Sequence, residues 1–170
     1  LNPFAHLDLF GTLALLLFGF GWAKPVPINP SRFKKPKRDM ALTALAGPLS
    51  NILLALVLMA IFKVYMLYGN INSTAGLMFG QIIYTILWTN LTLAVFNLLP
   101  VPPFDGSRIA LLFLPQRLYF RAMKYERYIM LAVLALVFLG LLDAPLSWLV
   151  NGMWRLMLHL TGFVELLWGY

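Results

Sequence analysis

Residues 41–67 read ALTALAGPLSNILLALVLMAIFKVYML, and residues 76–99 read GLMFGQIIYTILWTNLTLAVFNLL. The only charged residue in the two stretches is Lys63, which lies near one end, where a long side chain can reach the membrane surface. As helices, the stretches would extend for about 40 and 36 Å, more than the roughly 30 Å hydrocarbon core of a bilayer. They predict two membrane-crossing helices joined by the uncharged turn at residues 69–74.

The composition of the whole chain agrees with a membrane protein. Hydrophobic residues make up 61% of the 170 residues and charged residues 11%, against roughly 45–50% and about 25% in a typical soluble domain. Further apolar stretches at residues 9–22, 128–142 and 146–168 predict additional membrane segments, although the first is too short to cross alone. We therefore expect a single all-α integral membrane domain over residues 1–170, a multi-spanning helical bundle in the lipid bilayer.

The positive charge of the chain is concentrated in two loops. The formal net charge is +7, and the basic residues cluster in residues 24–38 and 117–127. The two predicted crossings separate these clusters, so both are expected on the same side of the membrane. Basic loops beside membrane spans mark the cytoplasmic side. We interpret the charge as this orientation signal and expect no nucleic-acid partner.

Residues 24–30 read KPVPINP and interrupt the helical pattern. Their three prolines exclude a helix and favour an extended backbone. Val26 and Ile28 would then point to one face. This predicts a proline-rich extended loop with the character of an edge strand.

Polar residues lie within the predicted spans. Asn51 falls in about a 100° arc of its helix with Thr43, Gly47 and Ser50, and Asn97 closes the next span. Such residues either pack against another helix or line a wet cavity, and the pattern leaves both open. The last apolar stretch has a polar face, which fits either a helix on the membrane surface or one packed against the bundle. That face comprises Asn151, Arg155, His159 and Glu165.

Asp105 lies just past the second span, in the sequence PPFDGSR of residues 102–108. An aspartate before a new helix commonly caps it by accepting backbone N–H groups. A carboxylate held by a rigid proline turn beside the bilayer is also suited to binding a metal ion. The residues alone favour the cap, with the metal ligand as the alternative. The chain contains no cysteine, which excludes disulfides and thiolate zinc ligands.

Four segments resemble the site-2 protease family, zinc metalloproteases that cut within membranes. The segment NLLPVPPFDG (97–106) matches that family's second signature, Asn-x-x-Pro-x-Pro-x-x-Asp-Gly. The segments LNPFAHLDLFGT (1–12), GWAKPVPINP (21–30) and AGPLSN (46–51) resemble a compact prokaryotic branch, in the expected order. The resemblance covers residues 1 to about 114.

The resemblance implies a role for Asp105 as the third protein ligand of a catalytic Zn²⁺. The other two ligands and the general base would come from a His-Glu-x-x-His helix, which is absent from the 170 residues. We expect that the chain begins just after that helix and that the 170 residues alone have no protease activity. The resemblance also implies a transmembrane protein substrate. Asn97 would hold its scissile peptide, Asn51 would line the same cavity, and the Val26–Ile28 edge would pair with unwound substrate.

A non-catalytic membrane protein is the alternative. A pseudoprotease that binds transmembrane helices, or a transporter-like channel, would also carry polar stripes and a proline-broken membrane segment. The residues encoded before Leu1 distinguish these possibilities, because a His-Glu-x-x-His motif there favours the protease.

Overall fold

The structure is a computed structural model that describes residues 7–18, 33–102 and 104–166. Within these ranges the chain is helical and contains no strand. It divides into two units, residues 1–36 and 37–170. The first unit contains helix α1 (Leu9–Phe18), whose first turn is fixed by Thr12, since its backbone N–H and its hydroxyl both donate to the Asp8 carbonyl. The prediction of an all-α membrane protein is confirmed.

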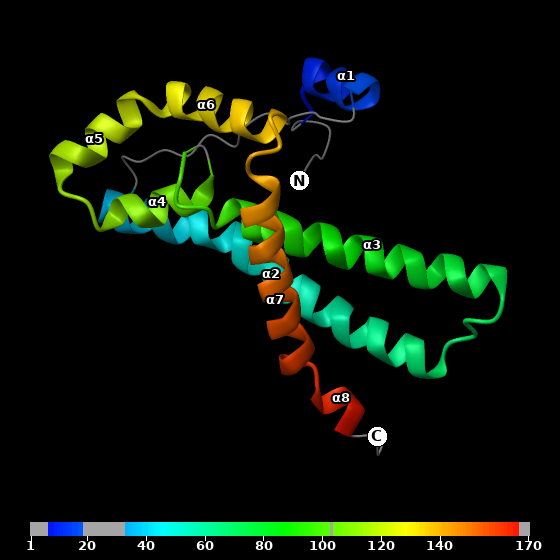
Figure 1. The fold of residues 1–170 in the computed structure, drawn as a ribbon. Coiled ribbons are helices and arrows are strands. Elements are labelled where there is room, and N and C mark those ends of the chain that lie inside the picture. Colours follow the sequence, from blue (N-terminus) through cyan, green and yellow to red (C-terminus); the bar gives the residue numbers. More distant parts are fainter. Residues whose placement is uncertain (1–6, 19–32, 103, 167–170) are drawn as a thin grey trace. The chain divides into compact units, whose positions relative to one another are not determined.

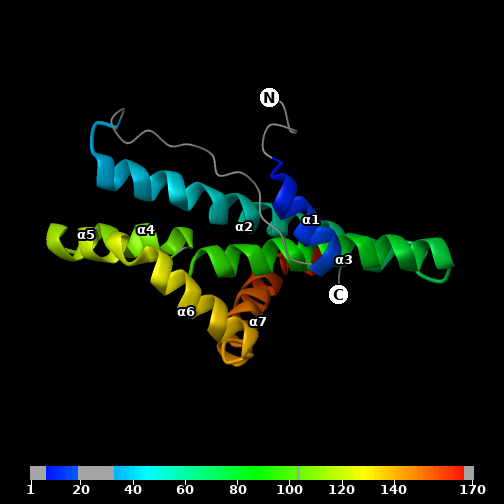
Figure 2. The ribbon, with the colours of Figure 1, turned by 90° about the horizontal axis from the view of Figure 1, so that it is seen from above.

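Two long helices form the framework of the second unit. Helix α2 (Pro36–Tyr68) and helix α3 (Thr74–Asn97) are both long enough and apolar enough to cross a membrane. Pro36 at the start of α2 has the φ angle that a helix needs, and the N–H it lacks would have no partner there. Ser73 caps α3 by accepting the N–H of Gly76 at 3.1 Å. The turn that joins α2 to α3 lies at one end of this helix pair (Figures 1 and 2).

Shorter helices complete the second unit. They are α4 (Asp105–Leu112), α5 (Gln116–Lys124), α6 (Glu126–Phe138), α7 (Asp143–Leu160) and α8 (Phe163–Leu166). Helices α4 and α5 lie at the end of the α2–α3 pair opposite the turn at residues 69–73 (Figure 2). There the Lys37 ammonium donates to the carbonyl of Leu114 at 3.2 Å. This contact brings together the basic residues at the start of α2 and the start of the second basic segment.

The C-terminal helices are bent sharply against each other. The α6 axis makes an angle of 88° with that of the α7–α8 segment, so the pair is either one broken span or a re-entrant turn. The break occurs at Gly140, whose φ of +69° is a conformation that other residues rarely adopt. We expected one helix at residues 146–168, but the structure has two: α7 begins at Asp143 and ends at Leu160, and α8 follows after a turn. Pro145 lies in the first turn of α7, where a proline is tolerated.

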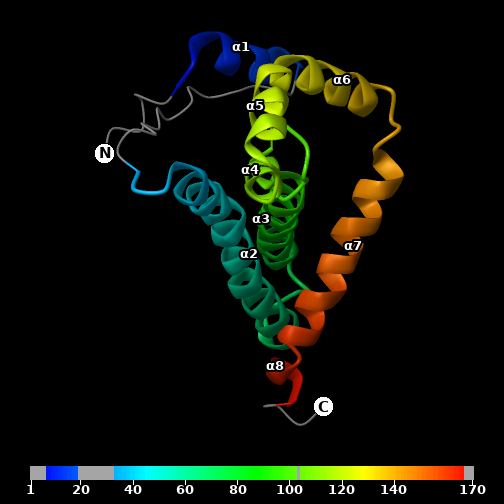
Figure 3. The ribbon, with the colours of Figure 1, turned by 90° about the vertical axis from the view of Figure 1, so that its left-hand side faces the viewer.

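The core of the second unit lies where α7 packs against α2 and α3 (Figure 3). Leu87 and Leu91 of α3 are completely buried there, as is Ala55 of α2. The rings of Trp88 and Trp154 lie 5.6 Å apart beside them. Met59, Val95, Val150 and Met157 complete the cluster.

Candidate metal and substrate site

The proline turn between α3 and α4 is held in a defined shape. Helix α3 ends at Asn97, and the Phe104 N–H donates to the Val101 carbonyl at 3.1 Å within the turn. The Phe104 ring meets that of Phe96 edge to face, with centroids 5.7 Å apart. The Ser107 hydroxyl, which is buried, donates to the Phe104 carbonyl at 2.6 Å. These contacts join the end of α3 to the start of α4.

Gly106 allows the turn to close. It is buried, and a Cβ atom built on it would clash with the carbonyl group of Leu98 and lie 2.6 Å from the Leu99 carbonyl oxygen. Both are backbone atoms, which cannot rotate away as a side chain can. A glycine directly after Asp105 is therefore a steric requirement, and the close contact fixes the position of Asp105.

Asp105 is the first residue of α4 and is partly buried. The N-cap position belongs to Phe104, which makes no side-chain cap hydrogen bond. Throughout the described ranges, no hydrogen bond or ion pair to the Asp105 carboxylate is present. The structure therefore does not support the N-cap alternative. A negative charge in the first turn still interacts favourably with the helix dipole.

Two opposing effects act on the Asp105 carboxyl group. Burial raises its pKa above the ordinary value, because removal from water disfavours the charged form, while the positive charge of Arg108 lowers it. Arg108 itself is engaged elsewhere. One guanidinium nitrogen lies 3.0 and 3.2 Å from the two carboxylate oxygens of Glu126. This ion pair connects α4 to α6 and leaves the Asp105 carboxylate available to another cation.

Gly47 of α2 faces the Asp105 carboxylate. A Cβ atom at Gly47 would lie 3.4 Å from Oδ2 of Asp105, which is ordinary van der Waals contact. The next residue, Pro48, is fully buried. The segment 46–51 and the proline turn, two of the motifs quoted from the sequence, are thus brought into contact. Because glycine has no side chain, this wall leaves room beside the carboxylate.

The two asparagines of the predicted site lie on separate helices. Asn51 is one helical turn beyond Gly47 on α2, and Asn97 ends α3. Both are partly buried, and in the described parts of the chain neither side-chain amide forms a hydrogen bond. No direct hydrogen bond joins them to Asp105. Val26, Ile28 and the whole proline-rich loop lie outside the described residues.

The described residues offer one candidate metal ligand here, Asp105. No group of three or more His, Cys, Asp or Glu side chains that could hold a metal is found among them. Asp105 nevertheless fits a role as a single ligand, since its carboxylate is partly desolvated and forms no hydrogen bond or ion pair within the described ranges, although the charge of Arg108 acts on it. A hard carboxylate oxygen is a normal zinc ligand. A complete metal site with Asp105 as one ligand would need further ligands from outside the described residues.

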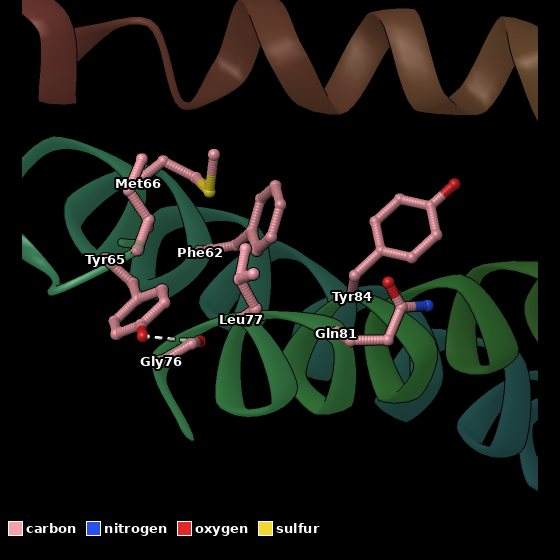
Figure 4. Close-up of a pocket in the computed structure, with 9 residues that line it drawn as sticks. Phe62, Tyr65, Met66, Gly76, Leu77, Gln81 and Tyr84 are labelled. Atoms are coloured by element: carbon pink, nitrogen blue, oxygen red, sulfur yellow. Dashed lines mark hydrogen bonds between the residues drawn. The ribbon is translucent and has the colours of Figure 1, made fainter. Parts of the chain in front are cut away.

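An apolar pocket of about 320 Å³ lies near the other end of the α2–α3 pair (Figure 4). Phe62 and Tyr65 of α2 line it together with Leu77 and Gln81 of α3. The Tyr65 hydroxyl donates to the Gly76 carbonyl at 2.7 Å, which connects the two helices. Tyr65 is 18 positions after Gly47, or about 27 Å along the helix, so this pocket is separate from the Asp105 site.

Sequence reasoning missed two interactions at this site. Gly47 had been considered part of a polar stripe, but its contact with Asp105 depends on the way the turn folds back. The Arg108–Glu126 ion pair joins positions 18 residues apart and follows no periodic pattern. The local sequence does indicate the tight packing of Gly106, because an Asp-Gly pair after several prolines is typical of a restricted turn.

The second unit is thus that of a helical membrane protein. Its proline turn holds the Asp105 carboxylate beside Gly47 of α2. The chain belongs to peptidase family M50, whose family model matches residues 12–140. This match includes Gly47, Asn97 and Asp105.

Two similar proteins cover about half of their own length in the match. "Putative zinc metalloprotease YwhC" of Bacillus subtilis (strain 168) is 44% identical over 111 residues, which cover 64% of this chain and 50% of that protein. "Putative zinc metalloprotease MJ0611" of Methanocaldococcus jannaschii is 36% identical over 104 residues, covering 59% of this chain and 49% of that protein. The matched region thus spans about half the length of each relative. No solved structure matches the chain significantly.

Proposed function

We propose that the complete protein is an intramembrane zinc metalloprotease and that this chain forms most of its membrane core. The observation that carries the proposal is Asp105, a partly buried carboxylate that forms no hydrogen bond or ion pair in the described parts of the chain and lies opposite Gly47 of α2. Membership of peptidase family M50 and the names of the two relatives support the reaction class.

In this proposal Asp105 provides one carboxylate ligand to Zn²⁺, and the remaining ligands and the general base come from the part of the protein outside this sequence. Zinc bound there supplies Lewis-acid activation for peptide hydrolysis. Gly106 and the Arg108–Glu126 ion pair keep the carboxylate in position by fixing the start of α4. Gly47 keeps the space beside it open.

The substrate is a transmembrane segment of another protein, cleaved in or near the bilayer. The amide groups of Asn97 and Asn51 would bind its backbone after it unwinds, because an intact helix uses its own carbonyls in internal hydrogen bonds. Val26 and Ile28 would pair with the unwound segment as an added strand. Both basic segments, residues 24–38 and 117–127, face the cytoplasm, and the Lys37–Leu114 hydrogen bond supports their placement on one side.

The test measures zinc content and cleavage of a defined transmembrane substrate in the full-length protein. Asp105→Asn removes the charge while preserving the size of the side chain. We expect it to lower zinc affinity and to reduce cleavage by at least about 100-fold, the order seen when groups that stabilise a transition state are removed.

Asp143→Asn is a matched control. Asp143 is also the first residue of a helix, α7, and is exposed. We expect this variant to retain zinc and activity. If Asp105→Asn also retained both, the ligand role would be wrong. If the full-length wild-type protein bound no zinc and cleaved nothing, the non-catalytic alternative, a protein that only binds transmembrane helices, would replace the protease.

A further inference from the structure

Two adjoining pockets lie between the C-terminal half of α2 and helices α7 and α8. They are far along α2 from Gly47, the residue that faces Asp105. One, of about 360 Å³, is bordered mainly by residues with charged or titratable side chains, namely Lys63, Arg155, His159 and Glu165, together with Leu158. The other, of about 290 Å³, is mainly apolar. The two share Lys63, Leu158 and Glu165, so they form one continuous depression with a charged part and an apolar part.

The charged part contains a cation, Arg155, that no described residue neutralises. Lys63 pairs with Glu165 at 2.8 Å and donates to the Leu158 carbonyl at 3.1 Å, and only 11% of its side chain is exposed. Its charge is therefore already compensated. Arg155 and His159 are exposed, and no hydrogen bond or ion pair involves either side chain within residues 7–18, 33–102 and 104–166. The cluster keeps at least one uncompensated positive charge, on Arg155.

The apolar part extends from the charged part along α2 and α7. Met59 and Phe62 of α2 line it on one side, and Trp154 of α7 on the other. The pocket of Figure 4 differs, because no charged residue lines it. A depression with a cation at one end and apolar walls at the other is complementary to an amphipathic anion.

The depth of the pocket in the membrane favours a lipid. Lys63 is 27 residues after the first residue of α2, about 40 Å along the helix, so the hydrocarbon core of roughly 30 Å ends near it. The described basic residues at the start of α2 lie at its opposite end, where Lys37 contacts Leu114. This length would place Arg155 and His159 at the level of lipid headgroups, with the apolar pocket toward the acyl chains.

We propose that this depression binds one anionic phospholipid, with its phosphate on Arg155 and His159 and an acyl chain between α2 and α7. The Lys63–Glu165 ion pair forms the wall between headgroup and chain and holds α8 against α2. A lipid bound there would connect α7 to α2 in the plane of the membrane. Basic pockets between membrane helices are a general means of recognising anionic headgroups.

Native mass spectrometry of the full-length protein in detergent tests this proposal. Phosphatidylglycerol and phosphatidylcholine with identical acyl chains are titrated separately, and the dissociation constant of the first bound lipid is measured. We expect tighter binding of phosphatidylglycerol, and a loss of about fivefold in its affinity for Arg155→Gln. The affinity for phosphatidylcholine is expected to change little in that variant.

Arg127→Gln is the matched control, since it removes an exposed cation in the basic segment at the other end of the molecule. It should leave the affinity of the first phosphatidylglycerol unchanged. Glycerol phosphate, which lacks acyl chains, should fail to displace the lipid at equal concentration. Equal binding of the two lipids, or equal losses in Arg127→Gln and Arg155→Gln, would refute the site. Displacement by glycerol phosphate would show a site for soluble anions and refute the lipid assignment.

Discussion

Gly106→Ala tests how the proline turn fixes Asp105. The added Cβ would lie 2.6 Å from the Leu99 carbonyl oxygen, whereas ordinary contact begins at 3.4 Å. The turn must therefore move by about 0.8 Å or more, and the clash with Leu98 requires a further shift. Asp105 is the neighbouring residue and will move with it. A displacement near 1 Å in a catalytic group can reduce the rate by about 100-fold.

We expect Gly106→Ala to lower cleavage by the full-length protein by about 100-fold and to cost roughly 1–3 kcal/mol of stability. Cleavage of a defined substrate and thermal unfolding in detergent measure the two effects. Gly152→Ala is the control, because nothing lies within 4 Å of a Cβ at that position in α7 and alanine is the better helix former. It should be neutral or slightly stabilising. A Gly106→Ala protein with wild-type activity and stability would refute the steric argument.

Two further predictions concern packing around the site and in the core. Gly47→Ala places its Cβ at ordinary contact distance from Asp105, 3.4 Å, and should retain zinc. Gly47→Leu should crowd the carboxylate and lower the zinc content measured by elemental analysis. Equal zinc content in the two variants would show that Gly47 does not border the metal. Leu91→Ala, at a residue 0% exposed in the core of α2, α3 and α7, should cost about 2–5 kcal/mol in denaturant titration. Leu93→Ala, at a position 48% exposed, should cost less than about 1 kcal/mol, and similar losses in the two variants would contradict the core assignment.

The helices of the second unit were largely predictable from composition. The stretches at residues 41–67 and 76–99 are apolar and almost free of charge, and α2 and α3 contain nearly all of both. A bilayer requires every backbone group to be paired within the segment, so length and hydropathy are sufficient to predict a helix there. The break near residue 140 was less predictable, because the positive φ of Gly140 ends α6 before any proline is reached.

The interactions that build the site were only partly predictable. Asp105 was recognised from its local sequence, because a turn with several prolines is encoded by adjacent residues. Its contact with Gly47 depends on how α2 packs against the turn, and no local pattern contains that information. The same limit applies to Glu165. The sequence predicted Glu165 on the polar face of one helix with Asn151, Arg155 and His159, but it lies in the separate helix α8. Its ion pair with Lys63, about 100 residues earlier, depends on the fold.

The central claim is that Asp105 binds zinc, and the most direct measurement is the zinc–oxygen distance in a structure of the zinc-loaded full-length protein. An anomalous-difference map would locate the metal independently of the protein atoms. We predict an Asp105 carboxylate oxygen at about 2.0–2.2 Å from the zinc. A fully ligated zinc with the Asp105 carboxylate outside its coordination sphere would contradict the account.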